Sequence, residues 1–290
     1  MKIALFSHCA IDTITIGDSN YEQIGGSACY GGITARQFKF DVELVTKFGS
    51  DFPYKQYLTD NKINFENALG EKNTTKFSIN IVGADRTLKL ENQCDPIEYA
   101  KTNADGYIIS PIFNEISTET LDKIKHDANF LLLDPQGFLR RINSEKTIFL
   151  ENTDLDLSHV DTIKVNPEEA QHLVGTSNTD AMVLLQRKGV EYVILTNKTE
   201  VSMLVKDRVY SITLPNKKIY DTTGIGDIFC ATFCCTMLRE RDFLWAFCFA
   251  GGAAQAALDS KNVGLLKIPT KGIIETNASY FYNLMKYRSI

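Results

Sequence analysis

The segment DTTGIGDIF, residues 221–229, places two glycines and a carboxylate at the start of a predicted helix. The first amide groups of a helix have no partners within it, and the helix dipole adds positive potential, so such a site favours an oxyanion or a phosphate. Asp227 would repel that anion and would add nothing to a simple binding loop. In an enzyme, however, it can serve as a base beside the group being transferred.

Other phosphate-binding motifs do not fit this segment. Phe229 occupies the position of the third glycine of the dinucleotide-binding fingerprint, and the Walker sequence GxxxxGK[ST] does not occur in the chain. An aspartate near a helix start often only stabilises the helix dipole. The spacing alone therefore leaves both a catalytic and a structural role open for Asp227.

A second polar run, Asn166-Pro167-Glu168-Glu169, follows the predicted strand Thr162–Val165. This run is also a good helix start, with asparagine as the cap and proline in the first turn. A structural role and a role at a binding site both remain open for it.

Alternating strands and helices must position these residues. Lys2–His8 opens with the continuous apolar run KIALF, which is typical of a buried central strand. The alternation that follows predicts βαβ units and a parallel sheet with helices on both faces. We expect further strands at Val42–Thr46, Tyr107–Ile109, Phe130–Leu133, Thr162–Val165 and Tyr192–Thr196, and helices at Ser27–Phe38, Asp51–Asn61, Asn114–Asp127, Pro167–Leu173, Thr179–Lys188, Gly226–Arg239, Phe243–Asp259 and Ile274–Lys286.

Shorter segments rich in β-forming residues interrupt this alternation. Ile11–Ile16 is a predicted strand, and Thr75–Val82 and Thr87–Leu90 form a predicted hairpin with Gly83-Ala84-Asp85-Arg86 as its turn. A second hairpin is expected at Val201–Val205 and Val209–Thr213. We predict one α/β domain over residues 1–290, with a small β appendage formed by residues of about 10–24 and 72–95.

Composition excludes several classes of protein. The 290 residues include 31 basic and 36 acidic side chains with a net charge of -5, and no stretch concentrates Lys and Arg, so nucleic acid and anionic membranes are not expected partners. The apolar stretch 243–258 is shorter than the roughly 20 residues that a bilayer requires. The 7 cysteines form no CxxC pair, which indicates reduced thiols in a cytoplasmic protein.

DTTGIGDIF closely resembles the C-terminal motif of the ribokinase-like (PfkB) family of sugar and nucleoside kinases, which reads DTTGAGD followed by xF. Ile225 replaces the usual small alanine. Other stretches resemble the family in the family's order: Gly25-Gly26 with the later run TKFGSD (46–51), and KVNPEE (164–169) with its NxxE motif. DPQGFLR (134–140) is similar to a run in the branch that includes archaeal-type sugar and inositol kinases.

The resemblance implies a ribokinase-like α/β fold, in which a central, mostly parallel sheet is flanked by helices and carries a small β-sheet lid. It also implies a kinase that uses ATP and Mg²⁺. Asp227 would be the general base that accepts the proton of the attacking hydroxyl. The amides of Gly224, Ile225 and Gly226 would form the anion hole for the transferred phosphate.

The resemblance extends to the cofactors. Asn166 and Glu169 would hold Mg²⁺ through water near the ATP phosphates, which suits a metal that keeps most of its water shell. The residues that it assigns to ATP are Asn166, Glu169, Thr196, Thr223, Gly224 and Gly226.

On the substrate side, the resemblance places Asp12 where family members hydrogen-bond a sugar diol. Gly25 and Gly26 would let backbone amides approach the same hydroxyls. Gln136 and Arg140 could reach this site as well. The alternatives are a surface position for Asp12, a tight turn for the glycine pair, and a solvated loop for Gln136 and Arg140.

Two positions depart from the family. GGSACYGG carries Cys29 and Tyr30 near the place where the family usually has an asparagine that contacts a sugar hydroxyl. The strand that ends at Thr196 usually continues with a glycine near the nucleotide phosphates, but here Asn197 and Lys198 follow. Lys198 could contact a phosphate or lie exposed in a turn, and the phosphate donor is left open.

The small β appendage fits a lid that covers the sugar and excludes water. Its edges would favour pairing with a second subunit, so a homodimer is expected. The leading hypothesis is an ATP- and Mg²⁺-dependent kinase that acts on a small sugar or polyol. A nucleoside kinase and a myo-inositol kinase of the same fold remain open, as does a non-catalytic regulator that binds a sugar or a nucleotide.

Overall fold

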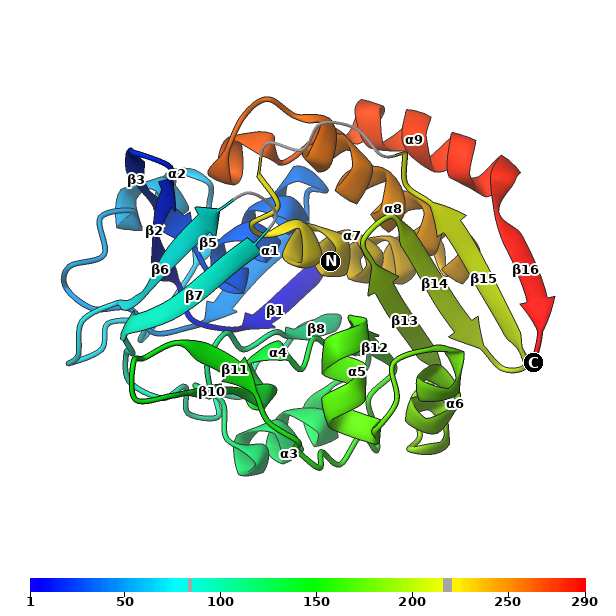
Figure 1. The fold of residues 1–290 in the computed structure, drawn as a ribbon, viewed down its shortest axis with the longest axis horizontal. Helices are drawn as coiled ribbons and strands as arrows, with labels where there is room; N and C mark the ends of the chain where they lie inside the picture. Colours follow the sequence, from blue (N-terminus) through cyan, green and yellow to red (C-terminus); the bar gives the residue numbers. More distant parts are fainter. Residues whose placement is uncertain (83–84, 216–220) are drawn as a thin grey trace.

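The computed structural model describes residues 1–82, 85–215 and 221–290, which build an α/β fold around one large sheet (Figure 1). The strand order is β16-β15-β14-β13-β12-β9-β8-β1-β4-β5. Strands from β13 to β5 are parallel, and β14 to β16 extend the sheet in antiparallel fashion. The strands are β1 (Lys2–Phe6), β4 (Asp41–Val45), β5 (Ile63–Asn64), β8 (Gly106–Ile109), β9 (Leu131–Leu133), β12 (Thr162–Val165), β13 (Tyr192–Asn197), β14 (Glu200–Val205), β15 (Arg208–Thr213) and β16 (Lys286–Ser289).

Helices cover both faces of this sheet, as the alternation of elements predicts (Figure 1). Side chains of the central strand β1 alternate between two cores: Ile3 and Leu5 belong to one, and Ala4 and Phe6 to the other. The first core lies under α1 (Ser27–Gln37), α7 (Ile225–Glu240), α8 (Phe243–Asp259) and α9 (Lys271–Leu284), and the second under α3 (Thr118–Asp127), α5 (Pro167–Val174) and α6 (Thr179–Arg187). No described helix is long and apolar enough to span a bilayer.

A second sheet of four strands lies beside the large one (Figure 1). Its order is β3-β2-β6-β7, in which two antiparallel hairpins meet through the parallel pair β2 and β6. The buried side chains Ile14, Phe77, Ile79 and Leu90 share a third core with Ile112 and Phe113 from the main domain. These strands are β2 (Ala10–Ile16), β3 (Ser19–Gly25), β6 (Thr75–Val82) and β7 (Asp85–Asn92).

The hairpin predicted at 75–90 is confirmed, since β6 and β7 pair antiparallel; Gly83 and Ala84 of its predicted turn lie outside the described residues. The helix predicted over Ile274–Lys286 is wrong at its end, because Lys286–Ser289 pairs with β15 as strand β16. The helix predicted from Asn114 starts instead at Thr118, where the side chain of Ser117 caps it. The remaining elements are α2 (Lys55–Asp60), where a helix was predicted from Asp51, and α4 (Gln136–Leu139), β10 (Arg140–Ile142), β11 (Ile148–Leu150) and a 3-10 turn (Gly264–Lys267), which were not predicted.

A buried carboxylate joins the loops that follow β1 and β8. Glu115 accepts hydrogen bonds from the backbone amides of His8 at 3.1 Å, Ile112 at 2.7 Å and Phe113 at 2.6 Å. Buried amides of this kind need acceptors. Glu115 therefore fixes the carboxyl-terminal edge of the sheet, where ligands bind in open α/β sheets.

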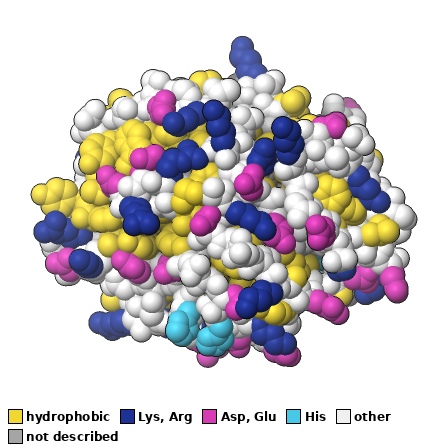
Figure 2. Space-filling view, turned by 180° about the vertical axis from the view of Figure 1, so that it is seen from behind, with side chains coloured by type: hydrophobic (Ala, Val, Ile, Leu, Met, Phe, Trp, Pro, Cys, Tyr) yellow, Lys and Arg dark blue, Asp and Glu magenta, His cyan; other side chains and the backbone are white. Residues whose placement is uncertain are grey.

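Apolar side chains gather at one edge of the rear face (Figure 2), the side on which α9 and β16 lie in Figure 1. Tyr282 of α9 is exposed and packs against Trp245 of α8, with ring centroids 6.0 Å apart. Tyr287 of β16 packs in the same way on Tyr210 of β15, at 6.2 Å. The strand β16 pairs with β15 at the edge of the large sheet, and all four of its residues are exposed.

Candidate active site

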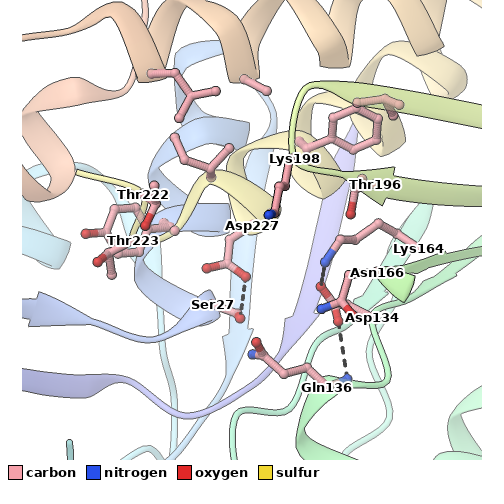
Figure 3. A pocket seen from close by; sticks show the side chains of 18 of the residues that line it. Ser27, Asp134, Gln136, Lys164, Asn166, Thr196, Lys198, Thr222, Thr223 and Asp227 are labelled. Carbon is pink, nitrogen blue, oxygen red and sulfur yellow. Dashed lines mark hydrogen bonds and ion pairs between the residues drawn. The ribbon is translucent and has the colours of Figure 1, made fainter. Parts of the chain in front are cut away.

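A cavity of about 770 Å³ opens at the carboxyl-terminal edge of the parallel strands, between the start of α7 and the small sheet. Figure 3 shows polar side chains that reach it from β9, β12, β13, α1 and α7. The predicted site residues that line it are Asp12, Gly26, Gln136, Arg140, Asn166, Glu169, Thr196, Thr223, Gly224, Ile225, Gly226 and Asp227. Of the predicted residues, Gly25 alone is outside this lining.

The glycine-rich turn before α7 is held by close packing. Gly224 adopts the left-handed conformation (φ 74°) as the N-cap of α7, and a Cβ atom there would lie 2.4 Å from the ring of the buried Tyr30. A Cβ atom on Gly226 would lie 3.1 Å from Nζ of Lys164. The first helical bond runs from the amide of Ile228 to the carbonyl of Gly224 at 2.9 Å. Amides earlier in the turn precede the helical ladder and can serve an anion.

A buried ion pair fixes the residue that leads into this turn. Nζ of Lys267 lies 2.8 Å from Oδ2 of Asp221, and the same carboxylate accepts the amides of Thr223 at 2.8 Å and Gly264 at 3.0 Å. Burial alone would raise the pKa of Asp221, but Lys267 and these amides bring it below its ordinary value. Both side chains are almost fully buried, so the start of α7 is tied to the 3-10 turn at Gly264–Lys267.

Asp227 lies on the first turn of α7 and faces the cavity (Figure 3). Oγ of Ser27 donates a hydrogen bond of 2.5 Å to its Oδ1, and Oγ of Ser110 donates to Ser27 at 2.9 Å. Burial raises the pKa of Asp227 above its ordinary value, the hydrogen bond from Ser27 opposes that rise, and the charge of Asp134 adds to it. A carboxylate with a raised pKa is a better proton acceptor than an ordinary aspartate.

A second buried ion pair forms the floor beneath this helix start. Lys164 of β12 and Asp134, which follows β9, approach to 2.8 Å. Although burial alone would lower the pKa of Lys164, Asp134 and Glu169 raise it, so its ammonium group stays charged. No role for Lys164, Asp134 or Ser27 follows from the sequence alone. The available signal for the first two is that each lies at the carboxyl end of a parallel strand.

Asn166 and Glu169 form the capping box that starts α5. Oδ1 of Asn166 accepts the amide of Glu169, and Oε2 of Glu169 accepts the amide of Asn166, both at 2.8 Å. Burial raises the pKa of Glu169, and Lys164 opposes that rise. The predicted helix start is confirmed, and both side chains also line the cavity.

The substrate-side glycines make room for Asp12. A Cβ atom on Gly25 would lie 2.4 Å from Oδ2 of Asp12, and one on Gly26 would lie 2.4 Å from the carbonyl of His8. Gly26 also has a positive φ of 87°, which favours glycine. Asp12 is buried and lines the cavity, so Gly25 acts by admitting its carboxylate.

The remaining predicted residues lie around the same cavity. The backbone amide of Gln136 donates to Oδ1 of Asp134 at 3.2 Å, and Nη1 of the Arg140 side chain donates to the carbonyl of Ile112 at 2.9 Å. Oγ1 of Thr196 donates to the carbonyl of Val165 at 3.3 Å. Gln136 begins the short helix α4 and Arg140 follows it, and both line the cavity.

Comparison with known proteins identifies this arrangement. The sequence model of the pfkB family of carbohydrate kinases matches residues 12–271. The chain therefore belongs to this family and is a kinase. No curated protein sequence gave a significant match.

Solved structures of the ribokinase family share the fold. A pyrophosphate-dependent kinase of that family, solved with sulfate, superposes with a TM-score of 0.81 at 19% identity over 94% of this chain and 99% of its own. Ribokinase from Arabidopsis thaliana, solved with ribose and ATP, gives 0.74 at 15% identity, covering 96% and 98% of the two chains. A nucleoside kinase from Methanocaldococcus jannaschii gives 0.72 at 18%, covering 96% and 98%.

We predict that Lys267→Ala lowers the free energy of unfolding by about 3–5 kcal/mol, because it leaves the carboxylate of Asp221 buried and unpaired. Lys271→Ala is the matched control: Lys271 pairs with Glu275 at 3.2 Å, but both side chains are half exposed, so its loss is expected to be under about 1 kcal/mol. Urea unfolding measures both. Similar small losses in the two variants would contradict the prediction.

The ion pair between Asp221 and Lys267 also predicts how the stability of the fold depends on pH. Because the pKa of Asp221 is lowered in the folded protein, its carboxylate stabilises the fold above its ordinary pKa. That contribution is lost as the pH falls through the lowered value. In Lys267→Ala, burial without the lysine raises the pKa of Asp221, so the variant is relieved as the pH falls through that raised value. The stability difference between wild type and Lys267→Ala should therefore begin to shrink above the ordinary range of aspartate and should shrink further as the wild-type carboxylate is protonated at its lowered pKa.

Proposed function

We propose that the protein transfers the terminal phosphoryl group of ATP, with Mg²⁺, to a hydroxyl of a small sugar or polyol. The observation that carries the proposal is the position of Asp227: its carboxylate lies one turn into α7, at the anion-binding helix start, and faces a cavity whose other wall holds Asp12. A nucleoside and myo-inositol remain alternative acceptors of the same chemistry.

The side chains can carry each part of that reaction. The hydroxyl oxygen of the acceptor attacks the terminal phosphorus, the bond from phosphorus to the leaving ADP oxygen breaks, and Asp227 accepts the hydroxyl proton. The amides of residues 224–226 would offset the negative charge on the moving group. One such donor is typically worth about 3–4 kcal/mol in the transition state.

The acceptor compartment suits a small polyhydroxy compound. Asp12 offers a buried carboxylate that can accept hydrogen bonds from two neighbouring hydroxyls, and Gln136 and Arg140 add donors. Phe77, Ile79 and Leu88 from the small sheet provide an apolar cover above these groups. We propose that this sheet, with the segments 10–24 and 72–95, acts as the lid that excludes water during transfer.

The donor compartment has a different character. Val201, Leu214, Ala254 and Leu258 line the cavity with apolar side chains from β14, the end of β15 and α8. Such a surface fits a planar base, whereas bare pyrophosphate would leave it uncovered. ATP is therefore the preferred donor, and pyrophosphate, used by the kinase compared above, is the alternative that must be measured beside it.

Asn166 and Glu169 fit a metal held through water. Their oxygens line the cavity but also serve the capping box of α5, and no cluster of three or more metal-binding side chains occurs in the described part of the chain. Mg²⁺ keeps several waters and binds chiefly to substrate phosphates. When bound, it would neutralise charge on the donor phosphates.

Assembly and location complete the proposal. β3 is an edge strand of the small sheet and its outer half is exposed, so it can pair with a second copy. Light scattering at micromolar concentration is expected to give the mass of a dimer, and a monomer mass would contradict lid pairing. The cysteines are free and buried, which fits a reducing cytoplasm.

We predict that Asp227→Asn lowers kcat by about 10²–10⁴-fold, because the amide cannot accept the hydroxyl proton. Its KM for the acceptor and its melting temperature should stay close to wild type, since the two side chains have the same shape. The measurement is release of ADP over a panel of pentoses, hexoses, inositols and nucleosides with Mg-ATP, and release of phosphate with pyrophosphate. Wild-type turnover in the variant would refute the mechanism.

The same screen separates an enzyme from a regulator. Tight binding of a sugar or nucleotide by the wild type, without turnover on any acceptor and with either donor, would favour the non-catalytic alternative.

We predict that Ser27→Ala moves the acid limb of the kcat/KM profile to higher pH. The hydrogen bond from Ser27 favours the carboxylate form of Asp227, so its loss raises a pKa that burial has already raised. A general base must be deprotonated, and activity falls as the pH drops through that pKa. Ser110→Ala, which removes only the bond to Ser27, should shift the limb less. An unmoved limb in Ser27→Ala would show that Asp227 does not set it.

A further inference from the structure

The turn between β13 and β14 carries a lysine in a conformation that favours glycine. Asn197 pairs with Glu200, so Lys198 and Thr199 form a two-residue hairpin turn, and Lys198 has a φ of 47°. Side chains disfavour this left-handed region, and such turns prefer glycine or asparagine. The conformation alone does not indicate a function, because Lys39, Lys62 and Lys146 also have a positive φ. What the side chain of Lys198 faces must distinguish it.

The next turn of the same sheet provides an internal comparison. Between β14 and β15, Val205 pairs with Arg208, and Lys206 occupies the equivalent first turn position with a φ of 54°. Both lysines are exposed, but Lys198 lines the cavity and Lys206 lies outside its lining. The two lysines share a backbone conformation and differ in what their side chains face.

Lys198 points inward. Figure 3 shows its side chain descending from the turn into the cavity, with its nitrogen drawn between the side chains of Asp227 and Lys164. This orientation therefore places a flexible cation between the anion-binding helix start and the end of β13.

Charge balance in the cavity distinguishes this lysine from the other cations. The ammonium of Lys164 is neutralised by Asp134 at 2.8 Å, and Arg140 is bonded to the carbonyl of Ile112. Within residues 1–82, 85–215 and 221–290, Lys198 has neither an ion pair nor a hydrogen bond. It is thus available to a ligand, and the ligand that seeks a cation beside a helix N-terminus is a phosphate.

We propose that Lys198 binds the terminal phosphate of the donor and offsets the charge that grows on the phosphoryl group as it moves to the acceptor oxygen. This inference rests on the proposed function. The acceptor oxygen still forms its bond to the terminal phosphorus as the bond to the ADP oxygen breaks, and Asp227 still accepts the proton. Lys198 remains protonated throughout and supplies only charge and a hydrogen bond.

The test compares Lys198→Gly with Lys206→Gly. In both variants glycine replaces a lysine that has a positive φ, and glycine adopts this conformation without strain. Both proteins should therefore melt at the wild-type temperature or above it. Lys198→Gly should lower kcat/KM for the donor by about 100-fold, and the KM for the acceptor should not change. Lys206→Gly should keep wild-type kinetics, and Lys198→Arg should recover part of the activity because it restores the charge.

Calorimetric titration with Mg-ATP and with inorganic pyrophosphate gives a second readout that needs no turnover. Lys198→Gly should bind both donors more weakly than Lys206→Gly does. Equal donor affinity and equal kcat/KM in the two variants would overturn the role of Lys198 while leaving the kinase proposal intact. A wild type without turnover would overturn the kinase proposal, and the titration would still decide whether Lys198 binds phosphate.

Discussion

The buried ion pair between Asp221 and Lys267 is the constraint on which the site depends. It fixes the backbone immediately before the glycine-rich turn, and that turn sets where α7 begins. The position of the anion-binding amides and the direction of Asp227 both follow from this one attachment. Because both partners are buried, removing either one leaves the other charge without a partner and without solvent, which destabilises the fold.

Packing then makes the turn specific. Gly224 rests on the ring of Tyr30, and Gly226 allows the ammonium of Lys164 to approach the first turn of α7. A side chain at position 224 would collide with the ring of Tyr30, whereas one at position 226 would only crowd the ammonium group of Lys164. The glycines of this motif therefore serve two purposes, since they open the amides to a ligand and let the helix sit directly on charged and aromatic groups.

The helix starts of this site could be predicted from the sequence, because each is determined by a few neighbouring residues. The helix start at 224–227 and the capping box at Asn166 and Glu169 depend on neighbouring residues, and both are present. Strand β16 pairs with the distant β15 and was missed for that reason. Strand β3 pairs with the neighbouring β2 but was missed because its sequence, SNYEQIG, is mostly polar. The hydrogen bond from Ser27 to Asp227 joins residues 200 positions apart, so only the fold reveals it.

The acidic character of the cavity makes local positive charge decisive. The protein has a net charge of -5, and Asp12, Glu169 and Asp227 all face the space that a phosphate donor must enter. In the proposed reaction Asp12 serves the acceptor and Asp227 takes the proton, so neither carboxylate can be removed to admit the donor. Attraction must come from groups that act over a few ångströms, such as helix amides and a lysine without a protein partner. The proposed role of Lys198 answers this need, because its turn lines the same cavity and carries a positive charge.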